Sequence, residues 1–157
     1  MKIREIASGL QFPEGPVAMS DGSILVVEIA RGTLSRVTPD GRIHVLANLG
    51  GGPNGVAIGP DGAAYVCNNG GFDWITEADG CRRPYSRATD YSGGRIERVN
   101  LYTGRSERLY EEIGGNPLRG PNDIVFDSSG GFYFTDLGKV TTDYVERGGI
   151  YYAHTDG

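Results

Sequence analysis

Short apolar runs separated by turns recur three times along the chain with the same spacing. The segments PEGPVAMSDGSILVVE (residues 13–28), PNGVAIGPDGAAYVCN (residues 53–68) and PNDIVFDSSGGFYFTD (residues 121–136) align without a gap. Each begins with Pro and a polar residue, and each has a glycine nine positions after the Pro, between two apolar stretches. This pattern predicts one β-hairpin in each copy.

A second strand–turn–strand motif follows each hairpin. It reads GTLSRVTPDGRIHVLA from residue 32, GRIERVNLYTGRSERLY from residue 94 and GIYYAHTDG from residue 149. One unit therefore contains four strands, and the first two units begin 40 positions apart, at Pro13 and Pro53. Four strands in about 40–45 residues are typical of a propeller blade. We expect an all-β fold, an incomplete β-propeller of about three blades, with approximate units 1–50, 51–118 and 119–157.

The second unit is longer than the first because of a polar loop insertion at residues 70–94. Such loops often cover a functional site, and equally often they are only mobile surface. The third unit ends in the turn after its third strand, whereas propellers close into rings of four to eight blades. We therefore expect a fragment of a larger propeller, with apolar blade faces open to self-association. A short sandwich of about ten strands is the alternative architecture.

Composition excludes several classes of protein. The chain has 26 glycines, where average usage gives about 11, and this excess fits many tight turns. A net charge of −5 without a basic stripe argues against nucleic acid as a partner. Neither a signal peptide nor a long apolar run is evident, so we expect a cytoplasmic protein that does not bind membranes. Cys67 and Cys81 are too few for a disulfide framework.

The residue after the repeated Pro is Glu14 in the first unit, Asn54 in the second and Asn122 in the third. If the units are blades around an axis, these side chains form part of a ring of carboxylate and amide oxygens. Such oxygens suit Ca²⁺, whereas no thiolate or imidazole stands there for Zn²⁺. For Asn54 alone, simple turn chemistry is the better explanation, because Asn tolerates turn geometry, whereas Glu14 has no such turn preference.

A second repeated position closes the second strand of each unit with Glu28, Asn68 or Asp136. We interpret these side chains as hydrogen-bonding groups of a turn or between blades, rather than as catalytic groups. The chain has no G-x-S-x-G motif, which argues against a serine hydrolase.

The segments FPEGPVAMSDGSILVVE, GRIERV and LRGPNDIVFDSSGGFYFTDLGK, with GGIYYAHTDG, resemble the senescence marker protein/gluconolactonase (regucalcin-like) family. The resemblance runs from about Leu10 to Gly157. It implies a six-bladed β-propeller whose axial channel binds a divalent metal, usually Ca²⁺, for which Zn²⁺ or Mn²⁺ could substitute in vitro. It also implies a small-molecule lactone or ester substrate.

Carried over by motif, the resemblance makes Glu14 of PEGP and Asn122 of GPND metal ligands. The general-base Asp of the family is expected beyond Gly157, so we expect the chain to be inactive alone. Asn54 and Asp123 are expected to line the channel, with Asp123 orienting Asn122. Arg82 and Arg83 of the insertion are candidates for substrate binding. The alternative to a metal-dependent lactonase is a non-catalytic propeller that serves as a binding scaffold.

Overall fold

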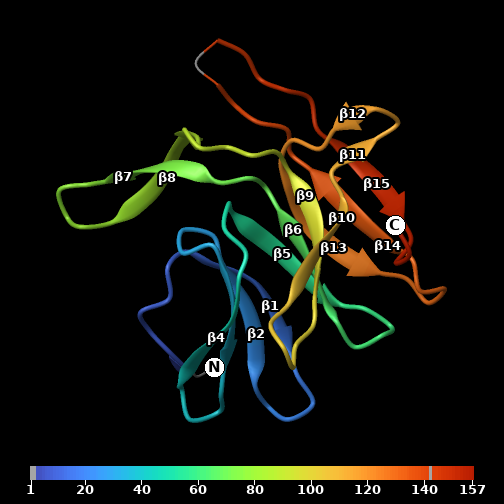
Figure 1. The fold of residues 1–157 in the computed structure, drawn as a ribbon. Coiled ribbons are helices and arrows are strands. Elements are labelled where there is room, and N and C mark those ends of the chain that lie inside the picture. The colour runs from blue at the N-terminus through green and yellow to red at the C-terminus, as the bar shows by residue number, and fades with distance from the viewer. Residues whose placement is uncertain (1–2, 142) are drawn as a thin grey trace.

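Three small antiparallel sheets, each one blade, make up most of the chain (Figure 1). The computed structural model describes residues 3–141 and 143–157, and these form strands without any helix, so none of them provides a helix that could cross a membrane. Blade 1 consists of β1 (Pro13–Ala18), β2 (Ile24–Glu28), β3 (Thr33–Val37) and β4 (Ile43–Asn48). Blade 2 consists of β5 (Pro53–Ile58), β6 (Ala64–Asn68), β9 (Arg95–Val99) and β10 (Ser106–Tyr110). Blade 3 has three strands, β13 (Pro121–Phe126), β14 (Phe132–Asp136) and β15 (Gly149–Ala153).

The repeated glycine makes the tight turn of the first hairpin in every blade. Gly22, Gly62 and Gly130 have φ angles of 80°, 75° and 86°, a region that glycine enters without steric cost. The amides of Gly22 and Gly62 each donate to the carbonyl three residues earlier, at 3.0 and 2.9 Å. The ungapped repeat in the sequence is therefore a repeat of one turn geometry.

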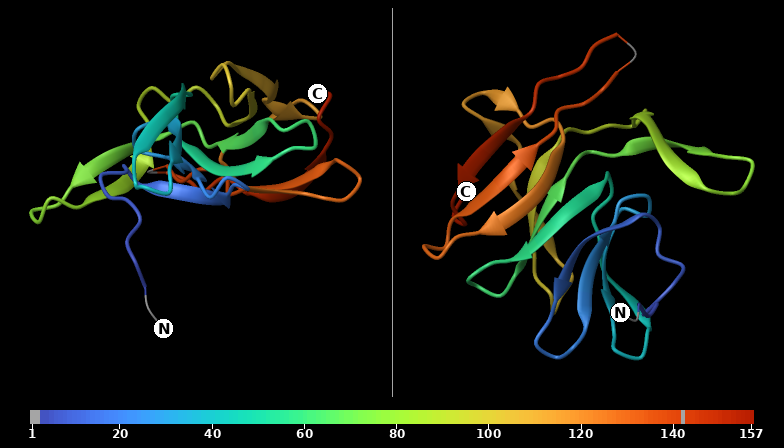
Figure 2. Two further views of the ribbon diagram at one scale, coloured as in Figure 1. Left: turned by 90° about the horizontal axis from the view of Figure 1, so that it is seen from below. Right: turned by 180° about the vertical axis from the view of Figure 1, so that it is seen from behind.

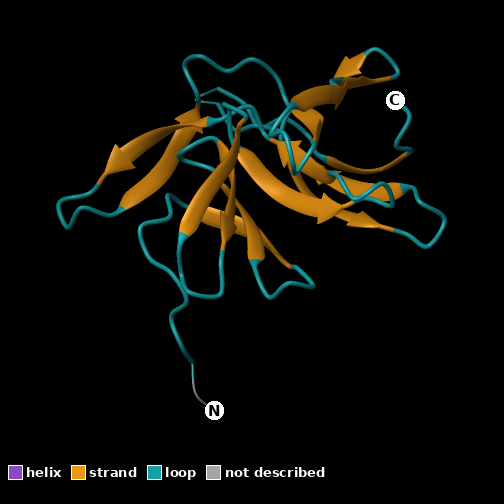
Figure 3. Cartoon of the chain, turned by 60° about the horizontal axis from the view of Figure 1, so that its bottom comes forward, coloured by secondary structure: helices purple, strands orange, loops and turns teal. Residues whose placement is uncertain are grey.

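The core lies between the blades, and β6 contributes to it on both faces. Ala64 and Val66 join a cluster with Leu34 of blade 1, whereas Tyr65 and Cys67 join a second cluster with residues of blade 3. Successive residues of a strand point to opposite faces, so a central blade needs a strand that is apolar throughout. All five residues of β6 are buried. The blades stack side by side through these clusters, as the views in Figures 2 and 3 show.

The innermost strands of neighbouring blades approach each other closely at two glycines. A Cβ atom on Gly15 would lie 2.9 Å from the backbone nitrogen of Val56, and one on Gly55 would lie 2.4 Å from the carbonyl oxygen of Asn122. Real Cβ contacts are not so short, so glycine is required at both places. This approach brings the first residues of β1, β5 and β13 together.

Two small hairpins were not expected from the sequence. The insertion predicted as a loop forms a two-stranded sheet of β7 (Phe72–Thr76) and β8 (Arg82–Arg87). A second hairpin of β11 (Glu112–Ile113) and β12 (Asn116–Pro117) connects blade 2 to blade 3. Within the insertion, the aromatic and β-branched residues of FDWIT favour a strand, whereas RRPYSR is mostly polar and shows no alternation.

The outer face of blade 3 exposes several apolar side chains. Val125, Tyr133 and Ile150 are 61%, 48% and 76% exposed. The apolar blade face that the sequence predicts to be open is therefore present on blade 3. Both cysteines are free, with Cys67 buried and Cys81 exposed, which agrees with the absence of a disulfide framework.

Candidate functional site

An open polar cavity lies where the three innermost strands begin. Its volume is about 430 Å³. It is lined by Glu14, Gly15, Pro16, Asn54, Val56, Asn122, Asp123 and Ile124. We call it the axial cavity. The structure thus brings four of the residues singled out in the sequence, Glu14, Asn54, Asn122 and Asp123, onto one surface.

The two asparagines of the axial cavity are hydrogen-bonded to each other. The Nδ2 atom of Asn54 donates to Oδ1 of Asn122 at 2.5 Å. The carboxyl group of Asp123 accepts from the backbone amide of Ile124 at 2.9 Å, and it makes no hydrogen bond to Asn122. The expectation that Asp123 orients Asn122 is therefore wrong, since Asn54 does so across the blade boundary.

The Glu14 carboxylate is largely uncommitted. It is exposed, and its one recorded hydrogen bond is a long one, 3.4 Å from the amide of Gly15. A carboxylate with free lone pairs suits a hard cation, and so does an amide oxygen such as Oδ1 of Asn122, which keeps one lone pair after accepting from Asn54. Within the described residues no three His, Cys, Asp or Glu side chains gather closely enough to hold a metal by themselves. The donor set of the axial cavity therefore fits part of a calcium shell.

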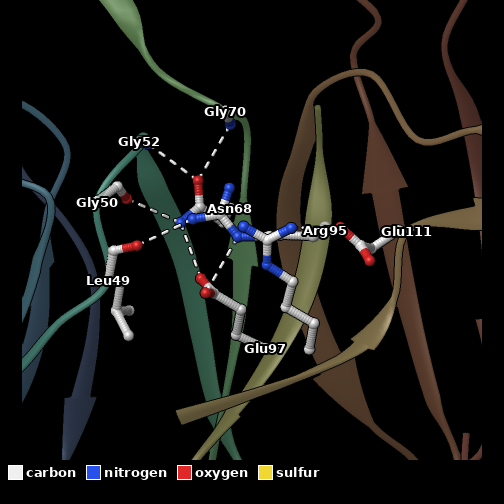
Figure 4. A network of polar contacts seen from close by, with 9 residues as sticks. Leu49, Gly50, Gly52, Asn68, Gly70, Arg95, Glu97 and Glu111 are labelled. Carbon is white, nitrogen blue, oxygen red and sulfur yellow. Dashed lines mark hydrogen bonds and ion pairs between the residues drawn. The ribbon is translucent and has the colours of Figure 1, made fainter. Parts of the chain in front are cut away.

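A buried polar network fixes the backbone at the start of β5 (Figure 4). The side chain of Asn68 accepts from the amides of Gly52 and Gly70 through Oδ1, at 2.9 and 3.0 Å. Through Nδ2 it donates to the carbonyl of Gly50 at 3.0 Å and to Glu97 at 2.8 Å. Both polar atoms of this fully buried side chain are used, and two of the four hydrogen bonds, to Gly50 and Gly52, hold the loop that delivers Asn54.

Glu28 of blade 1 and Asp136 of blade 3, at the position of Asn68, also accept backbone amides of the segment before the innermost strand. Glu28 accepts from the amide of Gln11 at 2.8 Å, and Asp136 accepts from the amides of Arg119 and Gly120 at 2.8 and 2.7 Å. In each blade, the residue that closes the second strand therefore holds the segment that enters the innermost strand. The interpretation of this position as structural hydrogen bonding is confirmed.

Sequence reasoning missed Glu97, the charged partner of Asn68, and the arginine that pairs with it. Arg95 and Glu97 on β9 are both nearly fully buried and form an ion pair with 3.0 Å between Nε and Oε1. Arg95 also donates to the carbonyl of Leu49 at 2.9 Å. In the sequence, the segment GRIERV has the alternation of a half-exposed strand, so nothing marks these two charges as buried.

The two arginines proposed for substrate binding lie on β8 and do not line the axial cavity. Arg83 is paired with Glu77 within the hairpin. The guanidinium of Arg82 lies 5.3 Å from the centre of the Trp74 ring. Arg82 borders a separate cavity of about 340 Å³, together with Leu10, Gln11, Phe12 and Ala30. Neither residue lines the axial cavity, and their side chains have different partners.

Comparison with known proteins gives a consistent result. A profile of the SMP-30/Gluconolactonase/LRE-like region matches residues 12–157. The chain is 28% identical over 148 residues to a gluconolactonase of Zymomonas mobilis, covering 85% of this chain and 35% of that relative. It is 31% identical over 150 residues to the lactonase drp35 of Staphylococcus saprophyticus, covering 94% of this chain and 39% of that relative. The chain thus spans well under half the length of these relatives.

The fold also matches a solved structure. XC5397 of Xanthomonas campestris, described as a gluconolactonase, superimposes with a TM-score of 0.67 at 18% identity, over 94% of this chain and 46% of that one. At this identity the likeness concerns the fold, and it confirms the expected partial propeller of about three blades. The profile, which covers nearly the whole sequence, shows that the chain belongs to the SMP-30/gluconolactonase/LRE-like family.

Proposed function

We propose that this chain is part of a metal-dependent lactonase that opens a sugar lactone or a similar ester. The family is shown, and its relatives include proteins named gluconolactonase and lactonase. The observation that supports a metal site is the convergence of Glu14, Asn54 and Asn122, from equivalent positions of three blades, on the axial cavity. A scaffold protein would have no need of an uncommitted carboxylate there.

In this proposal, Glu14 of blade 1 and Asn122 of blade 3 hold the cation together. Glu14 supplies negative charge, and Asn122 supplies a neutral oxygen. Asn54 fixes the direction of that oxygen through the hydrogen bond of 2.5 Å. A bound Ca²⁺ would supply Lewis-acid chemistry, which stabilises the oxyanion that develops when water attacks a lactone carbonyl.

The general-base Asp that the family resemblance implies matches none of the described residues. Besides Glu14, the described lining of the axial cavity has one carboxylate, Asp123, whose Oδ1 accepts from the amide of Ile124. We therefore expect the 157-residue chain to bind metal weakly and to show no lactone hydrolysis alone. Turnover would require residues of a longer protein that contains it.

The proposal is tested by melting the chain with increasing CaCl₂, for the wild type and for Glu14→Gln. We expect Ca²⁺ to raise the melting temperature of the wild type and to leave that of Glu14→Gln unchanged, because a ligand that binds only the folded state stabilises it. Glu112→Gln is the matched control, since Glu112 is an exposed carboxylate on β11, outside the axial cavity. Equal shifts in all three proteins would refute the metal site and leave the binding scaffold as the better explanation.

A further inference from the structure

The β7–β8 insertion stands at the end of the blades where the axial cavity lies. It leaves β6 after Asn68, which pairs with Pro53 at the start of β5. On the side of blade 1, the Trp74 ring packs against the ring of Phe12, with 4.9 Å between the ring centres. Phe12 stands two residues before Glu14 in the sequence. Phe12 is the one non-glycine residue of the described chain with a positive φ, 57°. Such strained residues are enriched at functional sites, so the place where the insertion meets blade 1 is a candidate for function.

On the side of blade 3, one buried lysine holds the root of the insertion. Lys139 lies on the connection between β14 and β15 and is 4% exposed. Its ammonium donates to Oδ1 of Asn69 and to the carbonyl oxygen of Gly71, each at 3.1 Å. It also lies 3.9 Å from the centre of the Phe72 ring, in the geometry of a cation–π contact. All three partners belong to the segment that leads from β6 into β7.

Burying this ammonium is costly, because within the described chain no carboxylate forms an ion pair with it. Removal from water lowers the pKa of Lys139 to about 8. The charges of Asp136 and Glu146 act in the opposite direction, while that of Arg87 adds to the lowering. Tyr91 also faces the ammonium, with its ring centre 5.6 Å away. An apolar side chain would fill the same space without this cost, so the lysine is poorly explained by packing alone.

We infer that Lys139 is a positioning residue that holds the root of the β7–β8 insertion at the end of the blades where the axial cavity lies, and thereby sets the affinity for substrate. The link to substrate affinity rests on the proposed lactonase function, whereas the positioning of the insertion by Lys139 concerns only this chain. Lys139 reaches across the blade boundary with a directional, charged contact, and it fixes the peptide of Gly71 and the ring of Phe72. From there the strand runs directly to Trp74 and its contact with Phe12.

The position of the insertion can be measured on the chain itself, because Trp74 is its only tryptophan. We expect Lys139→Met to raise the acrylamide quenching constant of Trp74 fluorescence at least twofold, while the far-UV circular dichroism and the melting temperature remain near those of the wild type. Arg147→Met is the matched control, because Arg147 is an exposed cation of the same connection. It should leave the quenching unchanged. Phe72→Leu, which removes the ring beside the ammonium, should have an intermediate effect and provides a second test if Lys139→Met does not fold.

A purely structural role predicts the opposite result, namely a lower melting temperature with wild-type quenching of Trp74, and that result would overturn the inference. For the affinity, Lys139→Met in a longer, lactone-hydrolysing protein that contains this chain should raise KM about tenfold and change kcat less than twofold. A fall in kcat at unchanged KM would refute the link to substrate. If the wild type neither responds to Ca²⁺ nor hydrolyses lactones, the proposed function fails, whereas the fluorescence test still decides the role of Lys139.

Discussion

Replacing Asn68 by alanine removes the hydrogen-bonding centre of the network at the start of β5. The backbone amides of Gly52 and Gly70 lose their acceptor, and the carbonyl of Gly50 and the carboxylate of Glu97 lose a donor. A buried polar group left without a partner costs about 1–3 kcal/mol. Leaving the two buried amides without an acceptor thus costs about 2–6 kcal/mol in the folded state, and we expect the free energy of unfolding to fall by about 4 kcal/mol. This is a large part of the roughly 5–15 kcal/mol that stabilises an ordinary domain.

The assay is urea unfolding followed by far-UV circular dichroism, with Asn100→Ala as the matched control. Asn100 also accepts two backbone amides through Oδ1, from Tyr102 at 2.9 Å and Thr103 at 3.0 Å, but in an exposed turn. Water replaces the lost acceptor there, so the loss should stay below about 1 kcal/mol. Equal losses for the two variants would show that burial of the Asn68 network is not the source of its stability, and would refute the reasoning.

Asn68→Asp separates the two halves of the network. The acceptor for the two amides remains, but a second carboxylate now faces Glu97 at the place of a 2.8 Å hydrogen bond. Two carboxylates at this distance raise the pKa of one of them above its value in the unfolded chain. The folded state then binds more protons, so the free energy of unfolding should fall as pH rises from about 5 to 8, relative to the wild type.

Three further predictions concern packing and titration. Gly55→Ala should destabilise the chain by at least about 1–3 kcal/mol in urea unfolding, because its Cβ would lie 2.4 Å from the carbonyl oxygen of Asn122; an unchanged midpoint would mean that β5 and β13 separate easily. Burial raises the pKa of Cys67, so a thiol reagent should modify the exposed Cys81 in the native chain and Cys67 only after unfolding. The pKa of Lys139 is about 8 in the folded chain, against the ordinary 10.5, so the unfolded state binds more protons between these pH values. The stability of the wild type relative to Lys139→Met should therefore grow by up to about 3 kcal/mol as pH rises from 8 to 10.5, and a flat difference would contradict the burial of the amine.

The repeat in the sequence predicted the blades because turns and strands are local. Gly22 and Gly62 each occupy the same kind of tight turn, and the apolar residues on either side of each glycine form the two strands of a hairpin. The insertion is polar overall, which predicts a loop. Its strands are half-buried (β7) or mostly exposed (β8), so burial imposes no regular alternation on them. The residues of the axial cavity could be named because Glu14 and Asn122 occupy one repeat position, and a propeller places such positions around one axis.

What the sequence could not provide is the pairing of polar groups between strands far apart in the chain. Glu28 is satisfied by Ser35 on the neighbouring strand, at 2.6 Å, whereas the equivalent Asn68 is satisfied by Glu97. In blade 1 the carboxylate of this hydrogen-bonded pair stands on the second strand, as Glu28, and in blade 2 it stands on the third strand, as Glu97. Neither residue indicates its partner in the sequence.

The sequence by itself determined the four-stranded unit and its number of copies, because these follow from local turn chemistry and short-range alternation. It also indicated the family, through the resemblance of its PEGP and GPND motifs, which the matching profile confirmed. Only the tertiary structure decided that Asn54 orients Asn122, that Arg82 and Arg83 lie away from the axial cavity, and that Lys139 is buried against the insertion. Such contacts join residues of different blades, in one case 70 positions apart. Their geometry depends on how closely the blades stack, which is set by buried volume and by glycines such as Gly55 rather than by any local pattern.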